Sequence, residues 1–190
     1  IVYSTAAGPM TSTAPAYDSG WATEISLDVQ WVHAIAPLAR IVLIEAPDAS
    51  VNSLTNAVKL ANAMGPGVVS MSFGANEGSW TSTYDSAFTA TGMSYLAATG
   101  DAGVAVEWPS VSSNVLAVGG TSLTYSGTGN RSEVAWSQTG GGGGNGVGTS
   151  SGTGVSGTTN TGGGGGGGGY SAGTGGTGGS GVIIISILDL

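Results

Sequence analysis

The stretch WATEISLDVQWVHAIAP at residues 21–37 predicts one uninterrupted helix, which its final proline ends. At about 100° per residue its polar side chains fall on one narrow arc, the expected solvent face. This arc comprises Ser26, Gln30 and His33. Glu24 and Asp28 fall on the opposite side, on the line of Trp31 and Ile35, where the helix should be buried. Because unpaired buried carboxylates are costly, two of them one turn apart indicate a functional site.

A simpler interpretation treats Glu24 and Asp28 as solvated acids near a helix N-terminus, where negative charge is favourable. Their position opposite the polar arc argues against it. His33 is expected at the surface. A Ser-His-Asp triad built on His33 is disfavoured, because this side chain faces away from both carboxylates.

Short apolar runs alternate with further helical segments along the chain. Buried strands are expected at 40–46, 68–74, 93–99 and 115–121, and helices at 51–64 and about 82–91. Asp48 or Ser50 can cap the helix at 51–64. This alternation predicts an α/β fold with a parallel sheet covered by helices on both faces. Active sites in such folds lie at the carboxyl ends of strands, where Ser72-Phe73-Gly74 and Gly100-Asp101 stand.

Composition excludes several classes of function. Charged residues make up 7% of the 190 residues, and only three of them are basic, for a net charge of −8. Too few cations are present to bind nucleic acid. Without cysteine the chain has neither disulfides nor thiolate metal ligands. The apolar run at 182–190 is too short to span a bilayer, so no membrane role is expected. The acidic balance fits a protein that stays soluble outside the cell or one that works in acid.

The character of the chain changes after Trp136. Residues 140–181 are a low-complexity segment of Gly, Ser, Thr and Asn, which cannot offset the entropy of ordering so much glycine. The predicted organisation is a partial catalytic domain at 1–139, this Gly-rich tail at 140–181, and a short apolar segment at 182–190. The last segment could cover an exposed face or add a strand, and its composition also favours aggregation.

Three ordered segments carry a resemblance to a known family. They are EISLD at 24–28 followed by AIAP at 34–37, VSMSFG at 69–74, and AATGDAG at 97–103 followed by WPS at 108–110 and VLAVGGT at 115–121. In this order and near this spacing they resemble the sedolisins, the serine-carboxyl peptidases. EVAW at 133–136 and the glycines at 140–142 are similar too. The resemblance covers roughly residues 1–142 and implies an incomplete subtilisin-like fold and peptide hydrolysis at acidic pH.

The resemblance also implies roles for individual residues. Glu24 matches the general base, Asp28 the carboxylate that orients it, and Asp101 an aspartate of the oxyanion hole. Ser72-Phe73-Gly74 matches the strand segment that pairs with the substrate backbone, although many members have Trp at Phe73. A serine needs a base within hydrogen-bond reach, and Asp101 must be protonated to donate a hydrogen bond. An ionised base beside a protonated donor requires low pH, so an acidic optimum is expected.

The nucleophile is missing from this pattern. The family serine stands in a Gly-Thr-Ser segment that opens a helix, on the order of a hundred residues after the oxyanion aspartate. Ser122 has the right neighbours but follows Asp101 too closely, and Gly178 stands where Gly-Thr needs a serine. Ser180 is a weak candidate. The family's calcium site has no recognisable ligand set, because Asp189 alone is not one, so no cofactor is identified.

Three functions follow from these patterns. The leading one is a secreted, monomeric, acid-acting serine-type endopeptidase that hydrolyses peptide or protein substrates, inactive as the chain stands. The second is a non-catalytic remnant or constructed fragment that at most binds peptide. The third is a Gly-rich extracellular structural protein, disfavoured because residues 1–139 are far from low complexity.

Overall fold

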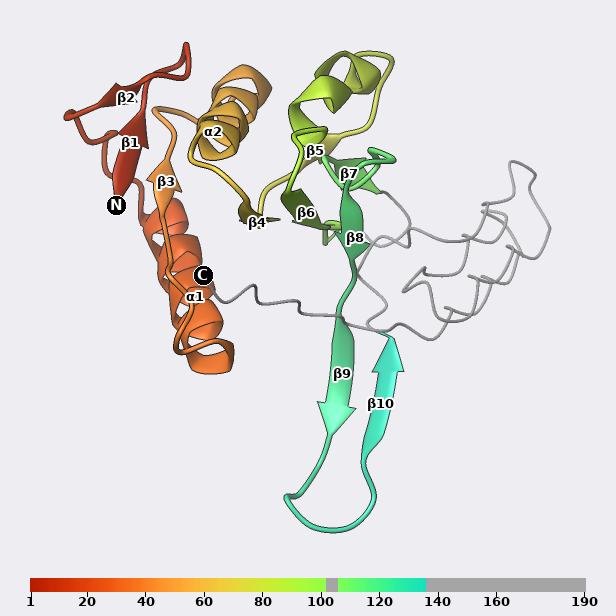
Figure 1. The fold of residues 1–190 in the computed structure, drawn as a ribbon. Helices are drawn as coiled ribbons and strands as arrows, with labels where there is room; N and C mark the ends of the chain where they lie inside the picture. The colour runs from red at the N-terminus through yellow and green to blue at the C-terminus, as the bar shows by residue number, and fades with distance from the viewer. Residues whose placement is uncertain (102–105, 136–190) are drawn as a thin grey trace. The chain divides into compact units, whose positions relative to one another are not determined.

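The computed structural model describes residues 1–101 and 106–135 (Figure 1). They divide into two compact units, each described by itself: residues 1–72 with 83–95, and residues 73–82 with the described part from 96 onward. The predicted Gly-rich segment 140–181, the apolar segment 182–190 and the candidate Ser180 lie outside the described residues.

A small mixed sheet opens the first unit. Strand β1 (Val2–Ser4) pairs antiparallel with β2 (Met10–Thr11) and parallel with β3 (Ile44–Glu45). The strand expected at 40–46 therefore shrinks to two residues, and its partner is the N-terminal strand. The Val2 amide donates to the Leu43 carbonyl at 2.8 Å, which extends this pairing by one bond.

Helix α2 (Val51–Ala63) contacts both β1 and β3. Of the two predicted caps, Ser50 takes the position, because its side chain accepts a hydrogen bond from the Ser53 amide. Asp48 stands two positions earlier and accepts from the Ser50 amide at 2.9 Å. The hydrogen bonds from the Ser50 hydroxyl and then from the Ser50 amide hold the pKa of Asp48 below its ordinary value of 3.8.

Helix α1 (Ser19–Ile35) forms where the sequence predicts it and begins at Asp18, whose side chain accepts from the Trp21 amide. The predicted polar arc is exposed, and Glu24 and Asp28 are half-buried. The predicted buried line is wrong in its second half, since Trp31 and Ile35 are each 61% exposed. No residue of α1 is fully buried, so its covered face ends after the second carboxylate.

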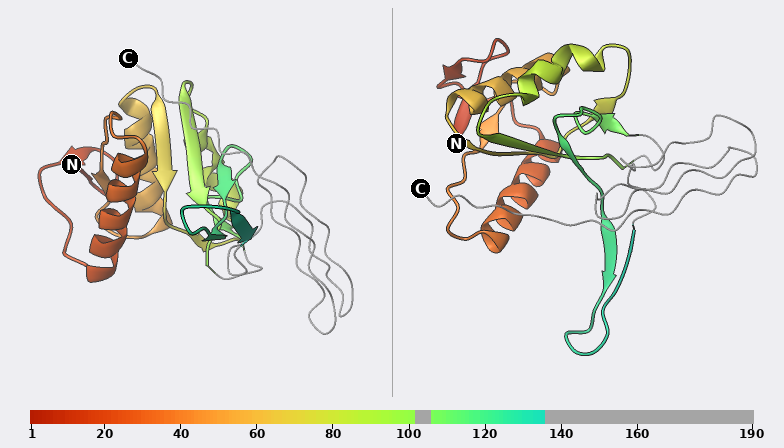
Figure 2. Two further views of the ribbon diagram at one scale, coloured as in Figure 1. Left: turned by 90° about the horizontal axis from the view of Figure 1, so that it is seen from below. Right: turned by 45° about the vertical axis from the view of Figure 1, so that its right-hand side comes forward.

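The central strands are β4 (Gly67–Met71), β6 (Met93–Ala98) and β8 (Leu116–Val118), in the order β4-β6-β8. Residues 93–95 of β6 belong to the first unit and residues 96–98 to the second. The yellow β4 and the lime β6 run side by side in the left view of Figure 2. Strands β6 and β8 are parallel, with Ala97 opposite Ala117. These strands confirm the positions of the predicted runs but not their full burial, since Val68 of β4 is 60% exposed and Leu116 of β8 is 50% exposed.

The core of the first unit contains a hydrogen-bonded tyrosine. Tyr95 is buried, its ring lies edge-on to Phe88 at 5.6 Å, and its hydroxyl donates to Asn62 at 2.8 Å. The Asn62 amide then donates to the Ala87 carbonyl at 2.8 Å. The helix expected at about 82–91 is instead a 3-10 helix, η1 (Thr81–Phe88). Its tighter turn places the Ala87 carbonyl where Asn62 on α2 can satisfy it.

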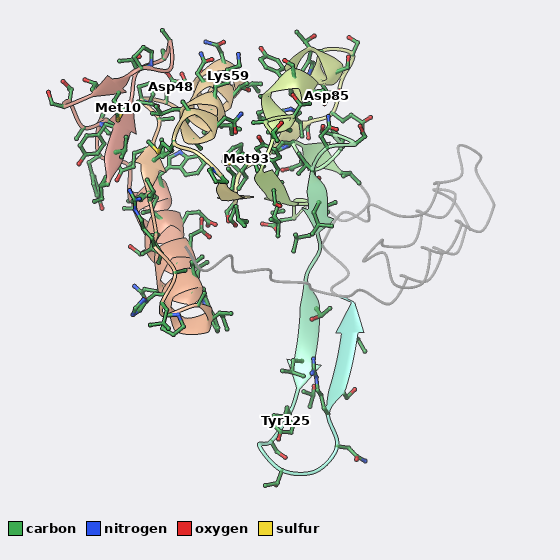
Figure 3. The ribbon with its side chains drawn as sticks, in the orientation of Figure 1. Met10, Asp48, Lys59, Asp85, Met93 and Tyr125 are labelled. Atoms are coloured by element: carbon green, nitrogen blue, oxygen red, sulfur yellow. The ribbon has the colours of Figure 1, made fainter. Side chains whose placement is uncertain are left out.

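The second unit contains two antiparallel pairs. Strand β5 (Ala75–Asn76) pairs with β7 (Glu107–Trp108), and β9 (Thr121–Thr124) pairs with β10 (Ser132–Ala135) as a hairpin. Tyr125, labelled in Figure 3, directly follows β9, and its hydroxyl donates to the Gly127 carbonyl at 2.8 Å. Trp108 is fully buried and is the largest core side chain of this unit.

Candidate active site

One carboxylate of the acid pair on α1 is hydrogen-bonded by a residue at the end of strand β4 in the same unit. Glu24 and Asp28 stand one turn apart on the helix, and both are half-buried. The Ser72 hydroxyl, directly after β4, donates a hydrogen bond of 2.8 Å to Asp28 Oδ1. These two residues are 44 positions apart in the sequence, so the fold brings them together. Within residues 1–72 no hydrogen bond joins the two carboxylates.

The remaining hydroxyls of this helix face have other partners. Thr23 donates to the Ser19 carbonyl at 2.9 Å, and Ser26 donates to the Ala22 carbonyl at 2.7 Å. Such bonds to the preceding turn are common for helical Ser and Thr. They leave Ser72 as the hydroxyl that serves the acid pair among the described residues. Chemically, Glu24 stands one helical turn from a second carboxylate, Asp28, whose orientation is fixed by the hydrogen bond from Ser72.

The segment after Ser72 belongs to the second unit, where aromatic rings support it. Phe73 packs against Trp108 with 6.1 Å between ring centroids, and Trp80 packs on the same indole at 5.9 Å. Phe73 and Trp80 are both half-exposed, whereas Trp108 is buried. Gly74 is exposed and leads into β5. The predicted substrate segment is therefore an accessible backbone next to an aromatic base, and its binding role stays a prediction.

Glu107 is a residue that the sequence reasoning missed. Its side chain lies directly over Gly74 and Gly100, so a Cβ atom at either glycine would overlap Glu107. At Gly100 that atom would stand 2.8 Å from the Glu107 Cδ. The one available signal was an acid immediately before the Trp108-Pro109 motif, and it does not say which glycines the side chain covers.

Asp101 follows Gly100, whose φ of +94° lies in the region that favours glycine. The Asp101 side chain is exposed. It stands in the second unit, with Phe73, Gly74 and Glu107, while Glu24, Asp28 and Ser72 stand in the first. The structure thus joins Asp28 to Ser72, and the oxyanion role of Asp101 stays a prediction.

Other sequence expectations concern residues outside these groups. His33 is exposed, in the last turn of α1. Ser122 lies inside β9, opposite Val134, and not at the start of a helix. Residues 1–101 and 106–135 contain no cluster of three His, Cys, Asp or Glu side chains that could hold a metal ion. No helix in the described ranges is long and apolar enough to cross a membrane.

Comparison with known proteins gives one family match. A family model described as "Glycine-rich domain" matches residues 47–188. The chain belongs to this glycine-rich domain family. The description names a composition and no activity, and the match includes both the described elements from α2 to β10 and the Gly-rich segment.

Two relatives match part of the chain. Kumamolisin from Bacillus sp. (strain MN-32) is 33% identical over 133 residues, which cover 60% of this chain and 24% of kumamolisin. Pseudomonas sedolisin, a serine-carboxyl proteinase complexed with two molecules of pseudo-iodotyrostatin, matches with a TM-score of 0.61 and 26% identity. That match covers 74% of this chain and 48% of the sedolisin chain. The predicted resemblance is confirmed: the chain contains a partial sedolisin-like domain with the α/β, subtilisin-like fold. The chain spans less than half the length of either relative.

Proposed function

We propose that this chain carries the general-base half of an acid-acting serine-type endopeptidase that is secreted, is monomeric and cleaves peptide bonds. In this proposal Glu24 takes the proton of a serine nucleophile, Asp28 orients Glu24, and Asp101 donates to the developing oxyanion. The observation that carries it is the carboxylate pair on α1, of which Asp28 is held by Ser72 at 2.8 Å. The relationship to kumamolisin and sedolisin supports the reaction class.

The chemistry requires each group in a defined protonation state. Glu24 accepts a proton only when it is ionised, and Asp101 donates a hydrogen bond only when it is protonated. Both conditions hold together at low pH, so hydrolysis should be fastest at about pH 3–5, where carboxylates titrate. No step of this proposal passes through a metal ion.

A second candidate function is a non-catalytic remnant that binds peptide. It is favoured by the exposed Gly74, which lies beside the aromatic rings of Phe73 and Trp108. A remnant would retain the exposed backbone at Gly74 and its aromatic base as a peptide-binding edge.

Peptide hydrolysis by the 190-residue chain separates the two functions. When a serine nucleophile such as Ser180 completes the site, the endopeptidase predicts turnover at about pH 3–5 that Glu24→Gln abolishes. Glu45→Gln is the matched control, because this glutamate lies in β3 and takes no part in the proposed site. Absence of turnover in the wild-type chain, with peptide binding retained, supports the remnant. A flat or alkaline pH–rate profile contradicts the acid mechanism.

A further inference from the structure

We propose that Ser72 is a positioning residue for the acid pair, and this inference rests on the proposed function. Its hydroxyl fixes the Asp28 carboxylate through Oδ1. In this proposal the other oxygen, Oδ2, is left to orient Glu24, which stands one turn earlier on the same helix. The sequence places Ser72 in a substrate-binding segment, so this role differs from the one that the resemblance implies.

The anchoring of Ser72 is suited to that role. It follows β4 directly, and the preceding residue, Met71, is only 3% exposed. The hydroxyl is therefore presented from the end of a strand with a buried side chain beside it. Asp28 belongs to the middle of a helix whose start is fixed by the Asp18 cap. A hydrogen bond between two such elements restricts the carboxylate more than a bond from a mobile loop would.

The Ser72 side chain can donate only one hydrogen bond. A serine hydroxyl has one proton to donate, and here that proton goes to Asp28. The same proton cannot also bind a substrate carbonyl. Substrate pairing by this segment would fall to backbone groups, and the Ser72 side chain would act only through Asp28.

The hydrogen bond can be tested on the intact 190-residue chain without any turnover. The test compares the side-chain carboxyl signal of Asp28 by NMR with ¹³C-labelled aspartate. Ser72→Ala should shift this signal, and Ser72→Thr, which keeps the hydroxyl, should restore it. Ser70→Ala is the matched control, because Ser70 is an exposed residue of β4 two positions away, and it should leave the signal unchanged.

The positioning of Glu24 needs a second readout. Where the wild-type chain hydrolyses peptide, Ser72→Ala should lower kcat on the order of 10²-fold with KM nearly unchanged, because misplacing a catalytic group costs about that much. Ser72→Thr should recover most of the rate. A change confined to KM would instead assign Ser72 to substrate binding.

The outcomes distinguish the two proposals. An Asp28 signal that Ser72→Ala leaves unmoved, or that Ser70→Ala moves equally, overturns the positioning role even if the chain is active. A chain without turnover in which the Asp28 signal follows the hydroxyl refutes the endopeptidase and leaves the hydrogen bond established. Covalent labelling of Ser72 by a fluorophosphonate would show a nucleophile and overturn the inference. Ser72→Cys, with similar size and a weaker donor, serves if Ser72→Ala does not fold.

Discussion

The Ser72 hydroxyl donates to Asp28 Oδ1 over 2.8 Å and thereby ties the end of β4 to the middle of α1. One partner comes from a helix and the other from a strand end. No local rule of secondary structure brings them together, so the bond reports on the tertiary fold of the first unit.

Energetic coupling between Ser72 and Asp28 is the first prediction. Ser72→Ala and Asp28→Ala, combined in a double-mutant cycle, should show a coupling of about 1 kcal/mol in the free energy of unfolding, because a hydrogen bond contributes roughly that much. Denaturant unfolding of the four proteins measures it. Ser70→Ala with Asp28→Ala should be additive, and additivity of the Ser72 pair as well would refute the bond.

A steric conflict between Gly74 and Glu107 is the second prediction. A Cβ at position 74 would overlap the Glu107 carboxylate and stand 2.9 Å from its Cβ. Gly74→Ala should therefore lower stability by about 1 kcal/mol, the low end for overpacking. Glu107→Ala in the same chain should restore most of that loss in thermal unfolding. Equal losses with and without Glu107→Ala would show that this contact is not the cause.

Gly100 provides the contrasting case. Glu107 also covers this glycine, but Gly100 has a φ of +94°. Gly100→Ala should cost about 1–2 kcal/mol from the backbone conformation alone. Because removing the Glu107 side chain does not change that conformation, the double variant should stay destabilised. Full rescue by Glu107→Ala would mean that the backbone relaxes at this position. Thermal unfolding of the two single variants and the double variant decides.

The lowered pKa of Asp48 should make part of the free energy of unfolding depend on pH. Hydrogen bonds from Ser50 lower the pKa of Asp48 in the folded chain below 3.8, its ordinary value. A lowered folded pKa stabilises the fold above the unfolded value, and this stabilisation is lost as the pH falls through the folded value. Wild type should thus lose more stability than Asp48→Asn between about pH 5 and pH 2. Urea unfolding across that range measures the difference. Parallel curves for the two proteins would contradict the prediction, and Ser50→Ala should reduce the gap.

The hydrogen bond from Tyr95 to Asn62 should contribute to the free energy of unfolding as much as an ordinary hydrogen bond does. Tyr95→Phe keeps the ring against Phe88 but removes the hydroxyl that donates to Asn62. The loss should be about 1 kcal/mol, because the Asn62 oxygen loses its donor in a partly buried place. Denaturant unfolding tests it. Tyr125→Phe is the matched control, since that hydroxyl bonds in an exposed turn, and an equal effect there would argue against a core contribution.

Much of the first unit could be predicted from the sequence. Uninterrupted helical periodicity gave α1, and Ser50 at a recognisable cap position gave the start of α2. The pairing of β3 with β1 could not be predicted, because a two-residue strand has almost no pattern of its own. The exposure of Trp31 was also missed, since a helical wheel says which side chains share a face and not how far along the helix that face is covered.

For the candidate site, too, some features could be predicted from the sequence and others could not. Glu24 and Asp28 were found because a helix places residues four apart on one face. Ser72 was found as part of a strand-end motif, but its hydrogen bond to Asp28 depends on two elements meeting. Glu107 was missed because its importance lies in the glycines that it covers, and these are seven and thirty-three positions away in the sequence.

The sequence by itself determined helices α1 and α2, the positions of the central strands, the resemblance to the serine-carboxyl peptidases and the pair of acids on α1. All of these depend on residue type and short-range spacing, and local backbone geometry follows directly from both. Only the tertiary structure decided that Ser72 donates to Asp28 and that Glu107 lies over Gly74 and Gly100. Such contacts join residues far apart in the chain, and their formation depends on how whole elements pack and not on the periodicity of any one of them.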